Sequence, residues 1–115
     1  KQSGLIATGH GDFSIKIWDP RQPNDESLKS LTSHKGWISD VCWHPQKDNL
    51  LLSGSHDMTL KLWDIRAKVP LHTLKNAHEE KILAVGWSDA QRFLSGGADA
   101  KLKIHETQGV SDTVQ

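Results

Sequence analysis

Short stretches in which apolar and polar residues alternate recur along the chain, and no stretch has the spacing of an amphipathic helix. The alternation is clearest where two aliphatic residues flank a lysine, at Ile15 and Ile17, Leu60 and Leu62, and Leu102 and Ile104. A period of two places successive side chains on opposite faces of an extended strand. The pattern therefore predicts an all-β chain of short, half-buried strands.

These stretches belong to a repeat. Three fourteen-residue segments align without gaps, at residues 6–19, 51–64 and 93–106. Two of their positions recur at spacings of 45 and 42 residues: Asp12, Asp57 and Asp99, and Trp18, Trp63 and His105. A second unit, 34–43, recurs 44 residues later at 78–87. A period of this length is typical of solenoids, propellers and other repeat folds.

The middle copy predicts four strands joined by short loops, at about residues 37–43, 49–54, 59–65 and 70–76. Pro45, Asp57 and Pro70 lie at or near the breaks, where residues of these types favour turns. Residues 20–29 are polar, with two prolines, and predict an extended loop. The small and polar residues after Thr107 predict a frayed end.

Four short strands per repeat, closing on Trp18-Asp19 and Trp63-Asp64, resemble the blades of the WD-repeat β-propeller family. The third copy ends on His105-Glu106 instead. The resemblance implies nearly three blades of four-stranded antiparallel sheet, at about 4–33, 34–77 and 78–107, with a flexible tail at 108–115. The first blade would lack its innermost strand, and the last would end after its third strand. We therefore expect a fragment of a longer chain, or self-association.

The resemblance also implies a polar network inside each blade. In the middle blade His34 would bond Asp57 and Ser53, and Ser53 would meet the indole of Trp63. The third blade retains His78, Ser95 and Asp99 but not the tryptophan, and the first retains Thr8, Asp12 and Trp18. Ser53, His34 and Asp57 are also the residue types of a hydrolase triad. Because the same types recur in the third blade, we expect structural networks and no catalytic site.

Three stretches carry a closer resemblance: LTSHKGWISDVCW, LLLSGSHDMTLKLWDIR and LSGGADAKLKI. They resemble the carboxy-terminal blades of the WD-repeat subunits of PeBoW complexes. That family implies Pescadillo- and Bop-type partners, pre-ribosomes, maturation of the large ribosomal subunit with its pre-rRNA processing, and a location in the nucleus, nucleolus and nucleoplasm. Its members also carry a ubiquitin-like domain that engages the midasin ATPase, and no segment of this sequence resembles that domain.

Composition limits the classes of partner that the chain is expected to bind. Fourteen basic and fourteen acidic side chains balance, so no global field favours direct sequence-specific binding of nucleic acid or an anionic membrane. Lys16, Lys61 and Lys103 recur in phase, and we favour strand lysines with packed stems and hydrated ammonium groups over a basic stripe for RNA. The seven histidines and single cysteine show no metal-ligand spacing, so no metal or cofactor is expected. The sequence favours protein partners.

A protein-docking face is predicted around Trp37, which falls in the connection entering a strand, with His56 emerging beside it and Lys35 nearby. Exposed tryptophans are enriched among binding hot spots because they desolvate a large area at little entropic cost. Lys81 is the equivalent of Trp37 in the third copy. The alternative, that Trp37 packs over its own blade, remains open.

Arg21 and Arg66 each follow a Trp-Asp pair by two residues. This arrangement resembles the substrate receptors of cullin-type ubiquitin ligases, which implies a second hypothesis for function. The simpler interpretation is a surface arginine that closes the end of a strand, as exposed ion pairs commonly do.

Overall fold

The computed structural model describes residues 4–21, 29–67, 69–75 and 77–106, and within these ranges the chain is all-β, as predicted. The strands are β1 (Ile6–Gly9), β2 (Ser14–Trp18), β3 (Lys29–Thr32), β4 (Ile38–Trp43), β5 (Leu50–Ser55), β6 (Leu60–Asp64), β7 (Pro70–Leu74), β8 (Ile82–Asp89), β9 (Arg92–Gly97) and β10 (Leu102–Glu106). No described segment is a helix long and apolar enough to cross a membrane.

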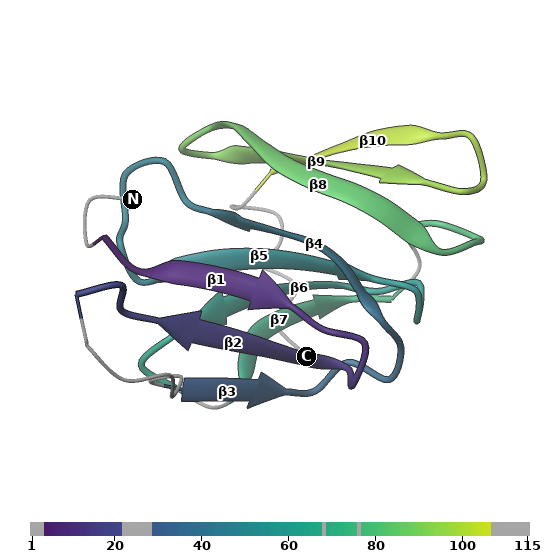
Figure 1. Cartoon of the computed structure of the whole chain (residues 1–115). Helices are drawn as coiled ribbons and strands as arrows, with labels where there is room; N and C mark the ends of the chain where they lie inside the picture. Colours follow the sequence, from purple (N-terminus) through teal and green to yellow (C-terminus); the bar gives the residue numbers. More distant parts are fainter. Residues whose placement is uncertain (1–3, 22–28, 68, 76, 107–115) are drawn as a thin grey trace.

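Three antiparallel sheets are stacked side by side, with the middle sheet between the other two (Figure 1). Each strand pairs with its neighbour in the chain, in the orders β1-β2-β3, β4-β5-β6-β7 and β10-β9-β8. The four strands of the middle sheet start and end within two residues of the predicted ranges. The first and third sheets hold three described strands each, which agrees with a partial propeller of nearly three blades.

The middle sheet is buried on both faces. Its neighbouring residues Leu51 and Leu52 point to opposite sides, and both are fully buried. One hydrophobic cluster lies between the first and middle sheets and contains Ile15, Ile17, Leu31, Leu51 and Trp63. The other lies between the middle and third sheets and contains Leu52, Leu60, Ala77, Ile82 and Phe93. Each sheet therefore buries apolar area only against its neighbours, as expected of a repeat architecture.

Gly54 allows the middle and third sheets to approach closely. A Cβ at this position would lie 2.7 Å from Cγ2 of Ile82 and 2.8 Å from Cγ1 of Val85. Polar contacts join the same two sheets. The Val85 N–H donates to Asp40 Oδ2 at 2.9 Å, and the Trp87 indole N–H donates to the Cys42 carbonyl at 3.2 Å. The two sheets form one packed unit.

His44 joins the middle sheet to the third sheet by a hydrogen bond that the sequence did not suggest. Its ring is buried, and its Nδ1 accepts the backbone N–H groups of Gln46 and Lys47, each at 3.0 Å. Because Nδ1 accepts, Nε2 carries the proton and donates to the carbonyl of Ala90, 2.8 Å away in the β8–β9 turn. The edge of the Trp87 ring packs against it, with the ring centroids 4.5 Å apart.

The tight turn of each repeat has one left-handed residue, Phe13, Met58 or Ala100, with φ of 73°, 70° and 65°. The preceding aspartate accepts the backbone N–H two residues further on, for example from Thr59 to Asp57 at 2.9 Å. Such side-chain bonds stabilise turns formed by Asp. The aligned aspartates that predicted turns therefore close them.

One prediction needs correction, and another lies outside the described residues. Lys29 is not in the loop predicted at 20–29 but begins β3, where its Nζ donates to the carbonyl of Ile65. The predicted flexible tail at 108–115 lies outside the described residues.

Candidate protein-binding site

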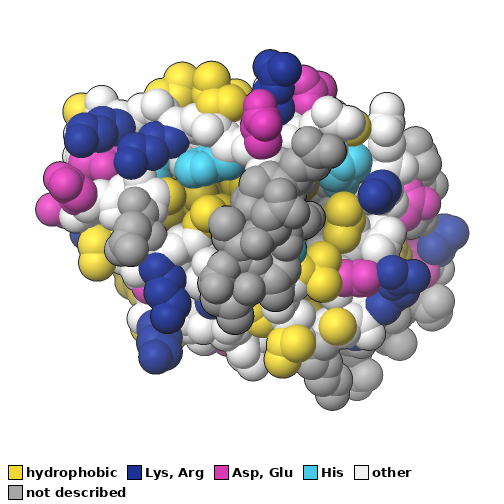
Figure 2. All heavy atoms as spheres, turned by 180° about the vertical axis from the view of Figure 1, so that it is seen from behind, with side chains coloured by type: hydrophobic (Ala, Val, Ile, Leu, Met, Phe, Trp, Pro, Cys, Tyr) yellow, Lys and Arg dark blue, Asp and Glu magenta, His cyan; other side chains and the backbone are white. Residues whose placement is uncertain are grey.

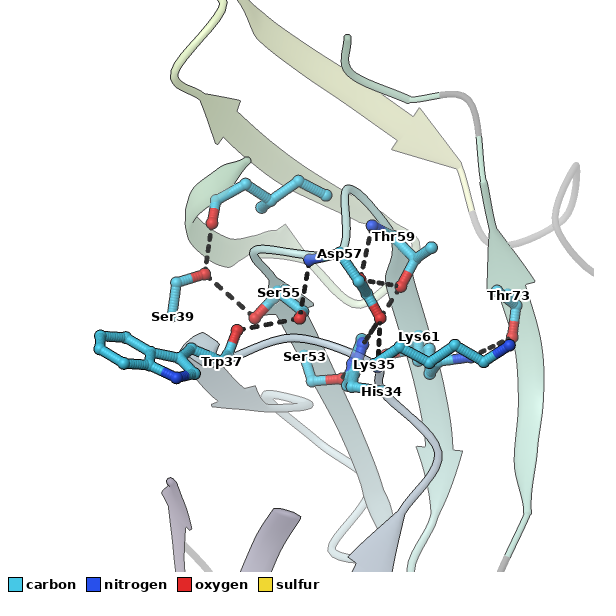
Figure 3. A network of polar contacts seen from close by, with 12 residues as sticks. His34, Lys35, Trp37, Ser39, Ser53, Ser55, Asp57, Thr59, Lys61 and Thr73 are labelled. Carbon is cyan, nitrogen blue, oxygen red and sulfur yellow. Dashed lines mark hydrogen bonds and ion pairs between the residues drawn. The ribbon is translucent and has the colours of Figure 1, made fainter. Parts of the chain in front are cut away.

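The polar network of the middle sheet runs from the core to the surface (Figure 3). The Trp63 indole N–H donates to Ser53 Oγ at 2.9 Å, and Ser53 Oγ lies 2.7 Å from His34 Nε2. His34 Nδ1 is 3.0 Å from Asp57 Oδ2. Since an ionised carboxylate can only accept, Nδ1–H donates to Asp57, and in a neutral ring Nε2 then accepts from the Ser53 hydroxyl. The chain of bonds fits a neutral His34 and an ionised Asp57.

Electrostatics support this protonation pattern. Burial lowers the pKa of His34, although its bond to Asp57 acts in the opposite direction. Burial acts to raise the pKa of Asp57, but hydrogen bonds from Thr59, from the Lys35 backbone N–H and from His34 outweigh it and lower that pKa to about 2. The Ser53 side chain is fully buried, so its hydroxyl is not presented to a substrate. This network holds the strands of the sheet together.

The third sheet repeats the network with a histidine in place of tryptophan. His78 Nδ1 lies 3.0 Å from Asp99, and His78 Nε2 lies 2.8 Å from Ser95 Oγ. His105 Nε2 is 3.0 Å from the same hydroxyl, and its ring stacks on Phe93. His105 Nε2 thus takes the place at the serine hydroxyl that the Trp63 indole nitrogen takes in the middle sheet. Burial, together with the charges of His78 and Lys103, lowers the pKa of His105, which keeps the ring neutral.

In the first sheet, the Trp18 indole donates to Thr8 Oγ1 at 2.7 Å, while Asp12 accepts from the Ser14 hydroxyl and does not join them. His10 Nε2 lies 2.7 Å from Thr8 Oγ1 and completes the set. Sequence reasoning missed His10 because its position in the repeat is Ser55 in the middle copy. Among the residues that the structure describes, no group of three or more His, Cys, Asp or Glu side chains could hold a metal ion.

Trp37 is exposed but held in place. Its side chain is 60% exposed, the ring stacks on His56 with the centroids 5.9 Å apart, and in Figure 3 it points away from the polar network. The Trp37 carbonyl accepts the His56 N–H at 2.8 Å and the Ser55 hydroxyl at 2.9 Å. The structure therefore brings Trp37 and His56 together on the surface.

Gly36 lets the Trp37 loop lie directly against the β5–β6 turn. A Cβ there would be 2.8 Å from the backbone nitrogen of Asp57, which is closer than real Cβ contacts. Asp57 also accepts the Lys35 N–H at 2.8 Å through Oδ2. The turn and the loop are thus fixed to each other on both sides of Gly36.

A hollow of about 370 Å³ opens beside the Trp37 ring, lined by Phe13, Gly36, Trp37, His56 and Lys81. These residues come from all three sheets, so the hollow exists only when the sheets are packed together. Lys81 was predicted from its alignment with Trp37, whereas Phe13 was missed. An apolar residue directly after the turn aspartate, as at Phe13 and Met58, was the available signal. Lys35 does not line the hollow.

Arg21 and Arg66 lie elsewhere and bind their own strands. Arg66 reaches Asp64 at 2.6 Å and Arg21 reaches Asp19 at 2.8 Å, while both arginine side chains stay largely exposed. Hydrogen bonds from Arg66 lower the pKa of Asp64. This geometry is that of an arginine closing the end of a strand.

The recurring lysines do not all reach water. Lys61 is buried and its Nζ donates to Thr73 Oγ1 on the neighbouring strand at 3.1 Å. Burial lowers the pKa of Lys61. The expectation of a hydrated ammonium group is therefore wrong at this position.

Comparison with known proteins places these features in context. The model of the WD domain, G-beta repeat, matches residues 25–64 and 68–106. The two matches take in the middle and third sheets together with part of the first.

Individual relatives of the chain are named as ribosome biogenesis proteins. The chain is 46% identical over 103 residues to a "Ribosome biogenesis protein WDR12 homolog" of Ixodes scapularis, covering 88% of the chain and 24% of the relative. It is 44% identical over 108 residues to the homolog of Trichoplax adhaerens, covering 90% and 25%. It is 34% identical over 119 residues to "Ribosome biogenesis protein YTM1" of Scheffersomyces stipitis, covering 96% and 26%. The chain spans about a quarter of the length of these relatives.

Proposed function

Because the chain belongs to the WD domain, G-beta repeat family, we propose that it acts as a non-enzymatic scaffold that binds other proteins during assembly of the large ribosomal subunit. The names of the relatives support the process. The observation that supports the mode of action is Trp37, a rigidly held aromatic ring exposed on the surface. Such a side chain contributes area to an interface with little loss of entropy.

Within this proposal the partners are Pescadillo- and Bop-type proteins, in a complex that associates with pre-ribosomes in the nucleus and nucleolus. Our proposed division into blades at about 4–33, 34–77 and 78–107 places Trp37 and His56 in the middle blade. The three packed sheets hold the docking face, and the buried networks keep each sheet rigid. The ubiquitin-ligase hypothesis is not favoured, since the relatives are named for ribosome biogenesis and both arginines bind their own aspartates.

The test compares the full-length protein that contains this chain with its Trp37→Ala variant. Lysates are sedimented through sucrose gradients, and binding to purified Pescadillo- and Bop-type proteins of the same organism is measured by calorimetry. We expect the parent protein to sediment with large-subunit precursors, and Trp37→Ala to weaken partner binding at least tenfold.

Val69→Ala is the matched control. It removes another exposed apolar side chain, next to the β6–β7 connection at the opposite end of the middle sheet. Absence of the full-length protein from precursor fractions would refute the proposed process. Equal affinities for the Trp37→Ala and Val69→Ala variants would refute the docking face alone.

A further inference from the structure

The hollow beside Trp37 has the shape and chemistry of a site for one side chain of a partner. Its volume of about 370 Å³ is at the small end of the range found for ligand pockets. Two aromatic rings and an imidazole form its walls, from Phe13, Trp37 and His56. A large apolar side chain could replace water against these rings and bury area on several sides.

The site is pre-organised. The Trp37 backbone is fixed by two hydrogen bonds and its ring by the stack on His56. Phe13 is held by the left-handed turn between β1 and β2, with φ of 73°. Because these side chains are placed before binding, little conformational entropy remains to be lost when a partner arrives.

Charge is one-sided at this site. Lys81 is the only Lys, Arg, Asp or Glu in the lining, and it forms no ion pair with a residue that the structure describes. Its acidic neighbour Glu80 does not line the hollow. A carboxylate beside the apolar side chain of a partner would find an ammonium group without an established partner here.

We propose that this hollow binds a protein segment in which a large apolar residue is directly followed by an acidic one. The inference rests on the proposed function, since it specifies the partner chemistry of the same docking face. The apolar side chain enters between Phe13 and Trp37, and the carboxylate meets Lys81. Stacked aromatic rings also suit a nucleobase, but single-stranded RNA requires a cationic groove along its backbone.

Neither the net charge of the chain nor the face shown in Figure 2 points to such a groove. The formal net charge of the chain is zero. On the side shown in Figure 2, Lys and Arg side chains lie interspersed with Asp and Glu where the side chains are described. One lysine in the hollow suffices for a carboxylate but not for a run of phosphates. The observations therefore favour a peptide.

The test is a titration of the full-length protein, labelled with ¹⁵N at tryptophan, with short peptides. The probes place Phe, Trp, Leu or Ile directly before Glu in a Gly-Ser background, and the signal is the Trp37 indole N–H, assigned with Trp37→Phe. We expect a saturable shift of this signal with at least one probe. Replacing its apolar residue by Ala should abolish the shift within the accessible concentration range.

The role of charge is tested by a double-mutant cycle. Changing Glu to Gln in the peptide should weaken binding two- to fivefold, as expected of a surface ion pair. This difference should vanish in Lys81→Gln and persist in Lys35→Gln, a control that alters an exposed lysine outside the hollow. The Lys81 side chain forms no ion pair with a described residue, so we expect its replacement to leave the fold intact.

Three results would overturn the proposal: no saturable shift with any probe up to millimolar concentrations, equal affinities for the Glu and Gln peptides, or a Trp37 shift produced by oligouridine RNA but by no peptide. The titration uses no ribosomal component. It can therefore fail while the protein still sediments with ribosomal precursors, or succeed when it does not, so this inference and the proposed function are tested separately.

Discussion

The middle and third sheets are built from the same repeat but end in different environments. Leu60 in β6 is fully buried, whereas its counterpart Leu102 in β10 is 70% exposed. Leu62 and Ile104 differ in the same way, at 6% and 66%. The sequence pattern at the two places is nearly identical. Burial in this chain is therefore decided by the neighbouring sheet rather than by the repeat itself.

The glycines of the two sheets show the same contrast. A Cβ at Gly54 would meet Ile82 and Val85 of the third sheet, while a Cβ at the equivalent Gly96 would meet nothing within 4 Å. Exposed Leu83 lies in the third sheet as well. Extended apolar surface of this kind typically marks a place for contact with another element. The polar networks, by contrast, are formed in both sheets.

The largest expected effect comes from truncating the aligned leucines. Leu60→Ala should lower the free energy of unfolding by about 3 kcal/mol, because a cavity replaces side-chain atoms in a closed core. Leu102→Ala should change it by less than about 0.5 kcal/mol, since the side chain already faces solvent. Urea unfolding at one protein concentration, followed by tryptophan fluorescence, measures both. Equal losses would mean that the outer face of the third sheet is covered in solution.

Removing the central hydroxyl of each network should give the next largest effect. Ser53→Ala leaves the Trp63 N–H and His34 Nε2 without their common partner in a buried site, which should cost about 2–3 kcal/mol. Ser95→Ala should cost about 1–2 kcal/mol, because the half-buried His105 ring can turn to water and only the buried His78 Nε2 is left without its partner. The same unfolding assay compares the two variants. A larger loss for Ser95→Ala would show that the third network is the stronger one.

The pH dependence of stability should distinguish the two polar networks, because one contains His105 where the other contains Trp63. The pKa of His105 is lower in the folded chain than its ordinary value of 6.5, so its contribution to stability is complete above pH 6.5 and declines as the pH falls below it. Trp63 does not titrate. His105→Trp should therefore reduce the loss of stability between pH 7 and pH 5, by up to about 1 kcal/mol for a half-buried group. Thermal unfolding across this range is the measurement, and parallel profiles would contradict the assignment of a neutral His105.

The smallest effect is expected at the ion pairs that close the sheets. Arg66 and Asp64 lie 2.6 Å apart, while Arg92 and Glu106 of the third sheet lie 3.9 Å apart, with both side chains exposed. Arg66→Ala should lower stability slightly, and Arg92→Ala should lower it by less. Unfolding in low and high salt provides the check, because screening should remove the difference. A difference that persists at high salt would indicate packing of the Arg66 stem.

Much of the fold could be predicted because the same strand and turn pattern occurs in three copies along the sequence. The strands of the middle sheet follow from alternation and from the turn residues, and aligned Asp57 and Asp99 both accept backbone N–H groups in their turns. Periodicity and turn chemistry are local, and a sequence displays them directly. The residues of the polar networks could be named because the resemblance to WD-repeat blades implies them.

What could not be predicted depends on contacts between repeats. His44 binds Ala90, 46 residues away, and no recurring pattern marks either residue. Phe13 joins Trp37 and Lys81 only through the packing of three sheets. His105 replaces a tryptophan in the sequence, although its ring places a nitrogen beside the serine hydroxyl where the indole does in the middle sheet. Such features arise from tertiary geometry, which alternation and spacing do not encode.

The left-handed turns have a consequence for how this surface can vary. At Phe13, Met58 and Ala100 the backbone takes the same conformation with three different side chains, all of them exposed. The strain of a positive φ is borne by the backbone, and the bonds that hold each turn come from the preceding aspartate. The hydrogen bonds of each turn thus do not involve the side chain of its left-handed residue. The turn backbone is held by its aspartate. Replacing the left-handed residue can therefore change what the surface recognises while the propeller blade beneath it stays the same.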